Sequence, residues 1–144
     1  MSDRRSYSDE GEEHMLPTPD GITTKPSGYA VDETIARLEA AIKAHSLTLF
    51  ARINHQQAAA EVGLSMQPAQ VLIFGSPRAG TPLMVAAPLS ALDLPLKALV
   101  WQDGDDTVWV SYTDPAYLAQ RYALPDELAR NIAGITQLIA GALS

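Results

Sequence analysis

The sequence predicts an α+β domain in which helices flank a small, mainly antiparallel sheet in two layers. Residues 96–101 and 107–112 are two runs of strand-forming residues joined by the turn-like residues 103–106, and their proximity favours an antiparallel hairpin. Residues 70–74 are an apolar run, which indicates a strand covered on both faces near the centre of the sheet. Residues 31–42 instead place apolar side chains at helical spacing. Strands and helices therefore share one core.

Length and composition bound the class of protein. The chain has 144 residues, 47% of them hydrophobic and 19% charged, which fits one globular domain. Residues 1–21 are rich in Ser, Asp, Glu and Pro, so we expect a disordered acidic tail ahead of one domain over 22–144. The net charge of −7 disfavours nucleic acid as a partner. The sequence has no cysteine, signal peptide or long apolar span, so we expect a cytoplasmic protein that does not enter membranes.

The first half of the domain contains alternating strand and helix signals. Residues 21–25 fit an edge strand, and the helix that follows should run from Val31 to about residue 46, with acidic residues in its first turn. Residues 47–53 then fit a strand. A short helix over 56–62 should end at Gly63, because glycine accepts the left-handed conformation that closes many helices.

The second half is marked by three prolines that fit helix starts. Residues 75–80 predict a turn, and Thr81 with Pro82 predicts a capped helix over 83–92. Asp114 before a proline predicts another helix to about residue 122, with Asp114 as its N-cap. After a further proline, the apolar spacing over 128–142 predicts one last amphipathic helix.

Four motifs carry a family resemblance. They are ARINH at 51–55, VLIFGSP at 71–77 with GTPLM at 80–84, LDLPLK at 92–97 and WVSYTDPAYL at 109–118. In order and spacing they resemble the domain-of-unknown-function 302 family, over residues 22–143. The resemblance implies a compact α+β fold that is commonly a homodimer, and it implies no defined reaction. Asn54 stands where the family pattern usually has Asp, which weakens any scheme that needs a carboxylate beside His55.

His55 is the first candidate site residue because it lies where a strand meets a helix and histidine changes charge near neutral pH. It is a candidate general base, metal or haem ligand, or simply a residue that bonds the turn backbone. The other histidines, His14 and His45, have no metal-type spacing to it, so we expect no metal site. An axial haem ligand needs only one histidine and an apolar pocket, and the sequence leaves that cofactor open.

The Gly75–Thr81 loop is the second candidate region. It follows a strand and precedes a helix, as a phosphate-binding loop does, but the lysine of that motif is missing. We therefore favour a rigid turn in front of a capped helix. With Arg78 nearby, this helix start is a candidate site for a carboxylate or another small anion.

Three more residues complete the candidate set. Lys97 lies between apolar residues of a strand, where burial would make its amine a base or nucleophile, although a solvent-facing lysine is the simpler interpretation. Tyr112 and Asp114 end the last strand, and Asp114 also has the capping role.

Three functions remain open at this point. The first is a homodimeric binding protein for a small ligand or haem-like cofactor, held near His55 and the Gly75–Thr81 loop. The second is an enzyme that uses His55 as general acid or base, with Lys97 or Arg78 stabilising negative charge. The third is a structural or protein-partner module without ligand or turnover.

Overall fold

A computed structural model describes residues 8–9, 12–13 and 18–144 of the chain. The predicted tail over 1–21 therefore lies mainly outside the described residues. The helices and strands follow in chain order: β1 (Ser8–Asp9), β2 (Glu12–Glu13), β3 (Ile22–Ser27), α1 (Val31–Ala44), β4 (Thr48–Asn54), α2 (His55–Glu61), β5 (Ala69–Gly75), α3 (Pro77–Ala86), the 3₁₀ helix η1 (Pro88–Leu92), β6 (Leu96–Gln102), β7 (Val108–Thr113), α4 (Pro115–Arg121), α5 (Asp126–Ala129) and α6 (Ile135–Leu143).

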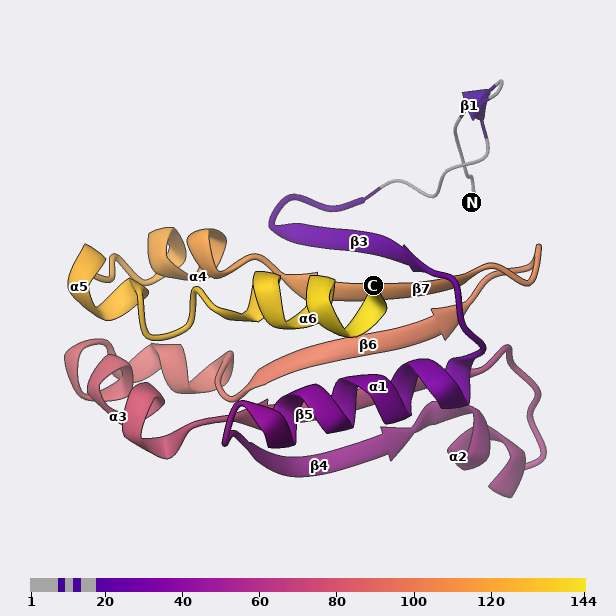
Figure 1. The fold of residues 1–144 in the computed structure, drawn as a ribbon, viewed down its shortest axis with the longest axis horizontal. Helices are drawn as coiled ribbons and strands as arrows, with labels where there is room; N and C mark the ends of the chain where they lie inside the picture. Colours follow the sequence, from indigo (N-terminus) through magenta and orange to yellow (C-terminus); the bar gives the residue numbers. More distant parts are fainter. Residues whose placement is uncertain (1–7, 10–11, 14–17) are drawn as a thin grey trace.

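Five strands form one sheet in the order β3-β7-β6-β5-β4, and every neighbouring pair is antiparallel. Figure 1 shows this sheet with β3 and β4 at its two edges. The α+β class, the β6–β7 hairpin and the edge strand β3 are confirmed. β1 and β2 pair with each other as a separate two-stranded ladder.

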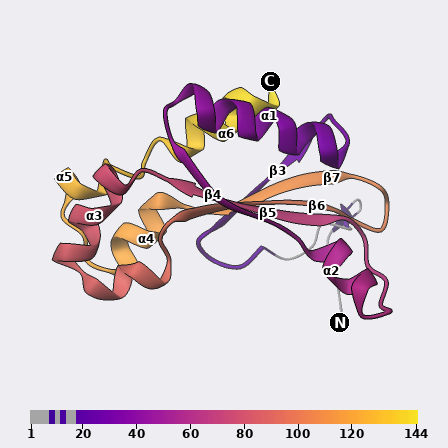
Figure 2. The ribbon, with the colours of Figure 1, turned by 90° about the horizontal axis from the view of Figure 1, so that it is seen from below.

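The helices cover the sheet unevenly. Figure 2 shows α1 and α6 together on one face of the sheet, with α3, α4 and α5 gathered beyond one end and α2 at the other end. No helix of the described residues crosses the middle of the opposite face (Figure 2). Two layers result, and one sheet face stays partly exposed. Among the described residues, no helix has the length and apolar character needed to cross a membrane.

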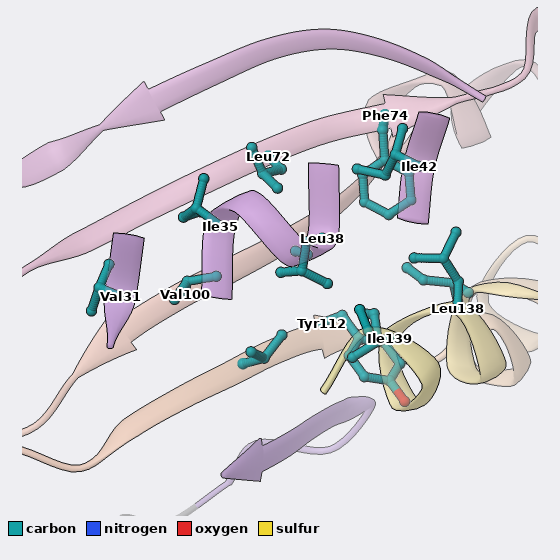
Figure 3. Packing of buried hydrophobic residues seen from close by; sticks show 14 of the residues in the cluster. Val31, Ile35, Leu38, Ile42, Leu72, Phe74, Val100, Tyr112, Leu138 and Ile139 are labelled. Atoms are coloured by element: carbon teal, nitrogen blue, oxygen red, sulfur yellow. The ribbon is translucent and has the colours of Figure 1, made fainter. Parts of the chain in front are cut away.

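The main core lies between α1, α6 and the sheet. Apolar residues of α1 recur every three or four positions, so one stripe of the helix faces β5 and β6. Figure 3 shows Leu38 and Ile42 of α1 over Leu72 and Phe74 of β5, with Ile139 of α6 beside them. All five side chains are at most 2% exposed. A second, smaller cluster under α3 and α4 centres on Leu83, Leu118, Leu124 and Ile132.

The predicted start of α3 is wrong. The helix begins at Pro77, because Ser76 acts as its N-cap and accepts a hydrogen bond from the Ala79 amide at 3.2 Å. Pro82 lies inside the helix rather than at its start. The segment 75–80 is therefore mostly helical, and the residues predicted as a turn form the first turns of α3.

The last helix and β5 also differ from the prediction. The apolar spacing over 128–142 belongs to two helices, α5 and α6, separated by turn residues 130–134. The apolar spacing survives because Leu128 and Ile132 join the smaller cluster while Ile135 belongs to the main core. β5 is not covered on both faces, since its residues alternate between buried and half-buried.

Candidate functional site

A cavity of about 500 Å³ lies at the end of the sheet where β5 runs into α3. We call it the end pocket. Its walls come from the β4–β5 end of the sheet, from α3, from the Leu94–Leu96 segment and from the start of α6. The lining residues are His45, Leu47, Phe50, Phe74, Gly75, Ser76, Pro77, Ala79, Gly80, Thr81, Met84, Leu94, Pro95, Leu96, Asn131, Ile132, Gly134, Ile135 and Leu138. The end pocket thus lies where the two hydrophobic clusters meet, since Leu96 packs against both and also lines the pocket.

The floor of the end pocket is apolar and rigid. Phe74, Ile135 and Leu138 belong to the main core, and Ile132 belongs to the smaller cluster. All four are at most 5% exposed. A ligand in the end pocket would therefore contact side chains fixed by the packing of both clusters, which is the arrangement of most small-molecule pockets.

Residues of the 75–81 segment, beside which the sequence hypothesis expected a ligand, form one wall, and those from Pro77 onward belong to α3. Gly80 donates its backbone N–H to the Ser76 carbonyl at 2.8 Å, which closes the first turn of α3. Asn131, in the turn between α5 and α6, donates its Nδ2 hydrogen to the Ala79 carbonyl at 3.0 Å. These contacts hold the wall in place from both sides.

His45 is the ionisable side chain at the rim of the end pocket. It follows α1, and its Nδ1 lies 2.8 Å from the Ala41 carbonyl oxygen. A carbonyl only accepts, so Nδ1 carries the hydrogen and Nε2 of the neutral ring has a free lone pair. The bond to Ala41 therefore fixes the orientation of the imidazole ring beside the end pocket.

Sequence reasoning did not select His45. It treated the residue only as a helix end without metal-type spacing to the other histidines. A sequence signal for the end pocket lies five residues further on, where the adjacent apolar residues Leu49 and Phe50 interrupt the strand alternation. Phe50 is the extra residue of a β-bulge between Leu49 and Ala51, and this places a 49%-exposed phenyl ring at the pocket.

His55 and Arg78 lie far apart. His55 is the exposed first residue of α2, just after Asn54, which pairs with Gln70 at the beginning of β5. Arg78 follows the other end of β5 and is exposed. Five residues of strand separate these ends, about 17 Å. A substrate at His55 therefore lies out of reach of Arg78, and His55 is not among the residues that line the end pocket.

The other three candidates lie on the hairpin. Lys97 is exposed, and its Nζ donates to the Pro95 carbonyl at 3.4 Å. Tyr112 is 3% exposed and packs in the main core, so it is not available to a ligand in the end pocket. Asp114 precedes α4 as predicted, but its side chain makes no capping bond and instead accepts a hydrogen bond from Thr23 Oγ1 of β3. Asp114 ties the edge strand to the end of β7.

The sheet face opposite α1 and α6 has a hollow in which Thr18, Pro19 and Lys97 lie beside an apolar surface that we call the open face. It is formed by Ile53, Val71, Leu99, Trp101 and Trp109. The two indole rings stack with centroids 6.2 Å apart. Their N–H groups are both bonded within the chain, to Ser111 Oγ at 2.9 Å and to Asp103 Oδ2 at 2.8 Å, so the rings present their apolar surfaces.

Metal chemistry receives no support from the part of the chain that the structure describes. Over these residues, no three His, Asp or Glu side chains come close enough together to hold a metal ion.

Comparison with known proteins adds family and fold. The family model described as "Domain of unknown function DUF302" matches residues 23–141. A solved structure, that of an uncharacterized conserved protein DUF302 from Bacillus stearothermophilus, superposes with a TM-score of 0.72 and 22% identity, and covers 87% of this chain and 97% of that chain. At this identity the likeness shows the fold alone.

Curated relatives are longer proteins. The fluoride-specific ion channel FluC 1 of Brucella suis biovar 1 (strain 1330) is 43% identical over 104 residues, which are 72% of this chain and 41% of that protein. FluC 2 of Brucella melitensis biotype 1 has the same identity over the same length, 38% of that protein. The chain spans about two fifths of the length of these relatives.

Proposed function

This chain belongs to the DUF302 family, a domain of unknown function, and from that premise we propose that it is a binding protein for an apolar small molecule held in the end pocket. The observation that carries the proposal is a hollow of about 500 Å³ that is lined mainly by apolar side chains, among them Phe74, Ile135 and Leu138 of the main core. A cavity of this size between two cores falls in the range of small-ligand sites.

The rim defines the kind of molecule that fits. The buried lining residues Phe74, Ile132, Ile135 and Leu138 offer only apolar contacts, and the polar side chains of the lining are His45, Ser76, Thr81 and Asn131. The expected ligand has an apolar body and carries hydrogen-bonding groups on the side that faces these polar residues. The sequence left open a haem-like cofactor with His55 as its axial ligand. In the end pocket, the histidine beside such a cofactor would be His45 instead.

The test is a titration with N-phenyl-1-naphthylamine, a neutral apolar dye whose fluorescence rises in apolar sites. The chain should bind one dye per molecule. In methyl-labelled protein, NMR shifts should appear at Met84, Ile135 and Leu138 of the end pocket. Shifts confined to Val71 and Leu99 would assign the dye to the open face and contradict the proposal.

We also propose that a second copy of the chain covers the open face. Apolar surface of this kind usually marks an interaction site, and in a twofold dimer the same patch, here the stacked indoles, would face its copy. Light scattering should then give twice the 15.4 kDa chain mass. Leu99→Asp should give monomers, while Val85→Asp, at a 76%-exposed position of α3, should not. A monomeric wild type contradicts this interface.

A second candidate function is a fluoride-responsive domain, favoured by the identity to the Brucella proteins named as fluoride channels. Titrating sodium fluoride with the protein should then broaden or shift the ¹⁹F signal, and sodium chloride should compete weakly. An unchanged ¹⁹F signal at equimolar protein contradicts it. Acid–base chemistry at His55, a protein-partner role and the cytoplasmic location stay predictions.

A further inference from the structure

A buried serine lies behind the end pocket. Ser90, in η1, is 1% exposed, whereas Leu89 and Leu92 of the same short helix are 70% and 75% exposed. Burial of apolar surface would favour the opposite arrangement, with the leucines inside and the hydroxyl in water. Such an inversion of the usual pattern is expected at functional or strained positions of a protein.

The hydroxyl of Ser90 has no hydrogen-bond partner among the described residues. Within that part of the chain, it is the one fully buried side-chain oxygen or nitrogen in this condition. A hydroxyl buried without a partner costs free energy, and native structures usually satisfy such a group with protein, water or a ligand. Ser90 therefore has a free donor for a molecule that reaches it.

The space in front of this hydroxyl is a small hollow, which we call the inner hollow. Its apolar walls are side chains of the smaller cluster, and its polar residues are Ser90, Asp93 and Tyr122. As the side chains stand, the inner hollow has no room for a separate water molecule. A buried water therefore does not account for the unpaired hydroxyl.

The inner hollow adjoins the end pocket. Leu94 and Ile132 line both spaces. Ile132 is buried in the smaller cluster, but Leu94 is only half-buried, in the segment before β6. A rotation of the Leu94 side chain is therefore the least costly way to join the two spaces.

The groups around Ser90 limit what can bind to it. Asp93 follows Ser90 by three residues and donates its backbone N–H to the Ser90 carbonyl at 3.0 Å, so the two side chains lie on the same side of the 3₁₀ turn. The Asp93 carboxylate accepts hydrogen bonds from Tyr122 and Arg121. An anionic group would meet this negative charge. A neutral oxygen therefore suits the Ser90 hydroxyl better than a carboxylate does.

We propose that Ser90 is a specificity-determining residue of the end pocket, where its hydroxyl donates a hydrogen bond to a neutral carbonyl or hydroxyl oxygen at the inner end of an apolar ligand. This inference rests on the binding role proposed for the end pocket, and it adds the chemical class of the ligand. The ligand body lies on the apolar floor, Leu94 turns aside, and the oxygen enters the inner hollow. Exposed polar groups of the lining exchange a bond to water for a bond to the ligand, whereas the Ser90 hydroxyl has no bond to lose.

The test compares two probes of nearly equal shape, 2-acetylnaphthalene and 2-isopropenylnaphthalene, in which a methylene group replaces the carbonyl oxygen. Their affinities are measured by displacement of N-phenyl-1-naphthylamine from the wild type and from Ser90→Ala. The difference in hydration of the two probes cancels when the ratio of their affinities is compared between the two proteins. The ratio of ketone to hydrocarbon affinity should fall about fivefold in Ser90→Ala, because one hydrogen bond is lost.

A comparison variant and the melting temperature complete the test. Thr81→Val removes a hydroxyl that lines the end pocket but not the inner hollow. An equal ratio in the wild type and Ser90→Ala, or a fall in Thr81→Val alone, overturns the role of Ser90. Ser90→Ala should keep or raise the melting temperature, and a fall of more than about 4 °C would mean that the hydroxyl has a partner in the fold, which also overturns it. If the dye itself does not bind to the wild type, the proposed function fails and this inference fails with it.

Discussion

Gly80 offers a way to fill the end pocket without harming the fold. It lies within α3 and lines the end pocket, and a Cβ placed on it meets no atom within 4 Å. Leucine is a much better helix former than glycine, by about 0.5–1 kcal/mol. Gly80→Leu should therefore raise the free energy of unfolding by about that amount, or the melting temperature by about 2–4 °C.

The same substitution should weaken ligand binding. A leucine side chain entering the cavity competes with any molecule there, and forcing extra carbons into a filled space typically costs about 1–3 kcal/mol. The affinity for N-phenyl-1-naphthylamine should fall at least about fivefold. Stability and binding should thus change in opposite senses, which no general destabilisation would produce.

Gly141 provides the matched control. It lies in α6, its Cβ also meets no atom within 4 Å, and it is not part of the end pocket. Gly141→Leu should raise the melting temperature by a similar amount and leave dye affinity unchanged. The measurements are thermal denaturation by circular dichroism and fluorescence titration of the three proteins. If Gly80→Leu binds the dye as tightly as the wild type does, the end pocket is not the dye site.

Three further substitutions test the local structure. Gly21→Ala should lower the free energy of unfolding in urea by more than about 2 kcal/mol, because Gly21 has φ +84° and a Cβ would come within 2.4 Å of the Tyr117 ring. Gly63→Ala is the control: Gly63 has φ +79° but no neighbour within 4 Å, so the loss should be only about 1 kcal/mol. Equal losses in the two variants would contradict the Tyr117 contact. The pKa of Tyr122 is raised above 10.0, first by its hydrogen bond to Asp93 and then by partial desolvation and the Asp93 charge. The bond therefore stabilises the fold below pH 10, and this stabilisation is lost as Tyr122 ionises at higher pH. Absorbance titration at 295 nm should show a late-ionising tyrosine that is missing in Tyr122→Phe, and an unchanged curve would contradict the contact.

The fold followed from the sequence where one local signal dominated. The β6–β7 hairpin was predicted from two runs of strand-forming residues around a turn. α1 was predicted from apolar residues at helical spacing, and β3 from its strand-forming residues. The start of α3 was missed because two Ser/Thr-proline pairs compete, and Ser76 with Pro77 forms the cap rather than Thr81 with Pro82. Local chemistry alone does not rank two such starts.

The candidate site followed only in part. Residues of the 75–81 segment line the end pocket, but from Pro77 onward they form the first turns of α3 rather than a loop, and ligand binding beside them stays a prediction. His55 was selected for its position at a strand end, but in an antiparallel sheet the ends of β4 and β5 point in opposite directions. His45, at the start of β4, is the residue that this pairing brings to the loop. The strand order determines which of the two histidines lies near residues 75–81, and a single sequence does not reveal that order.

Native mass spectrometry of freshly purified protein tests the central claim most directly. The account predicts a population that carries one bound molecule of discrete excess mass over the 15.4 kDa chain, or over its dimer, and predicts that Gly80→Leu loses this population while Gly141→Leu keeps it. An absorbance spectrum of the same sample would identify haem as the occupant. A bare chain in all three proteins, together with no uptake of N-phenyl-1-naphthylamine, would contradict a ligand-binding end pocket.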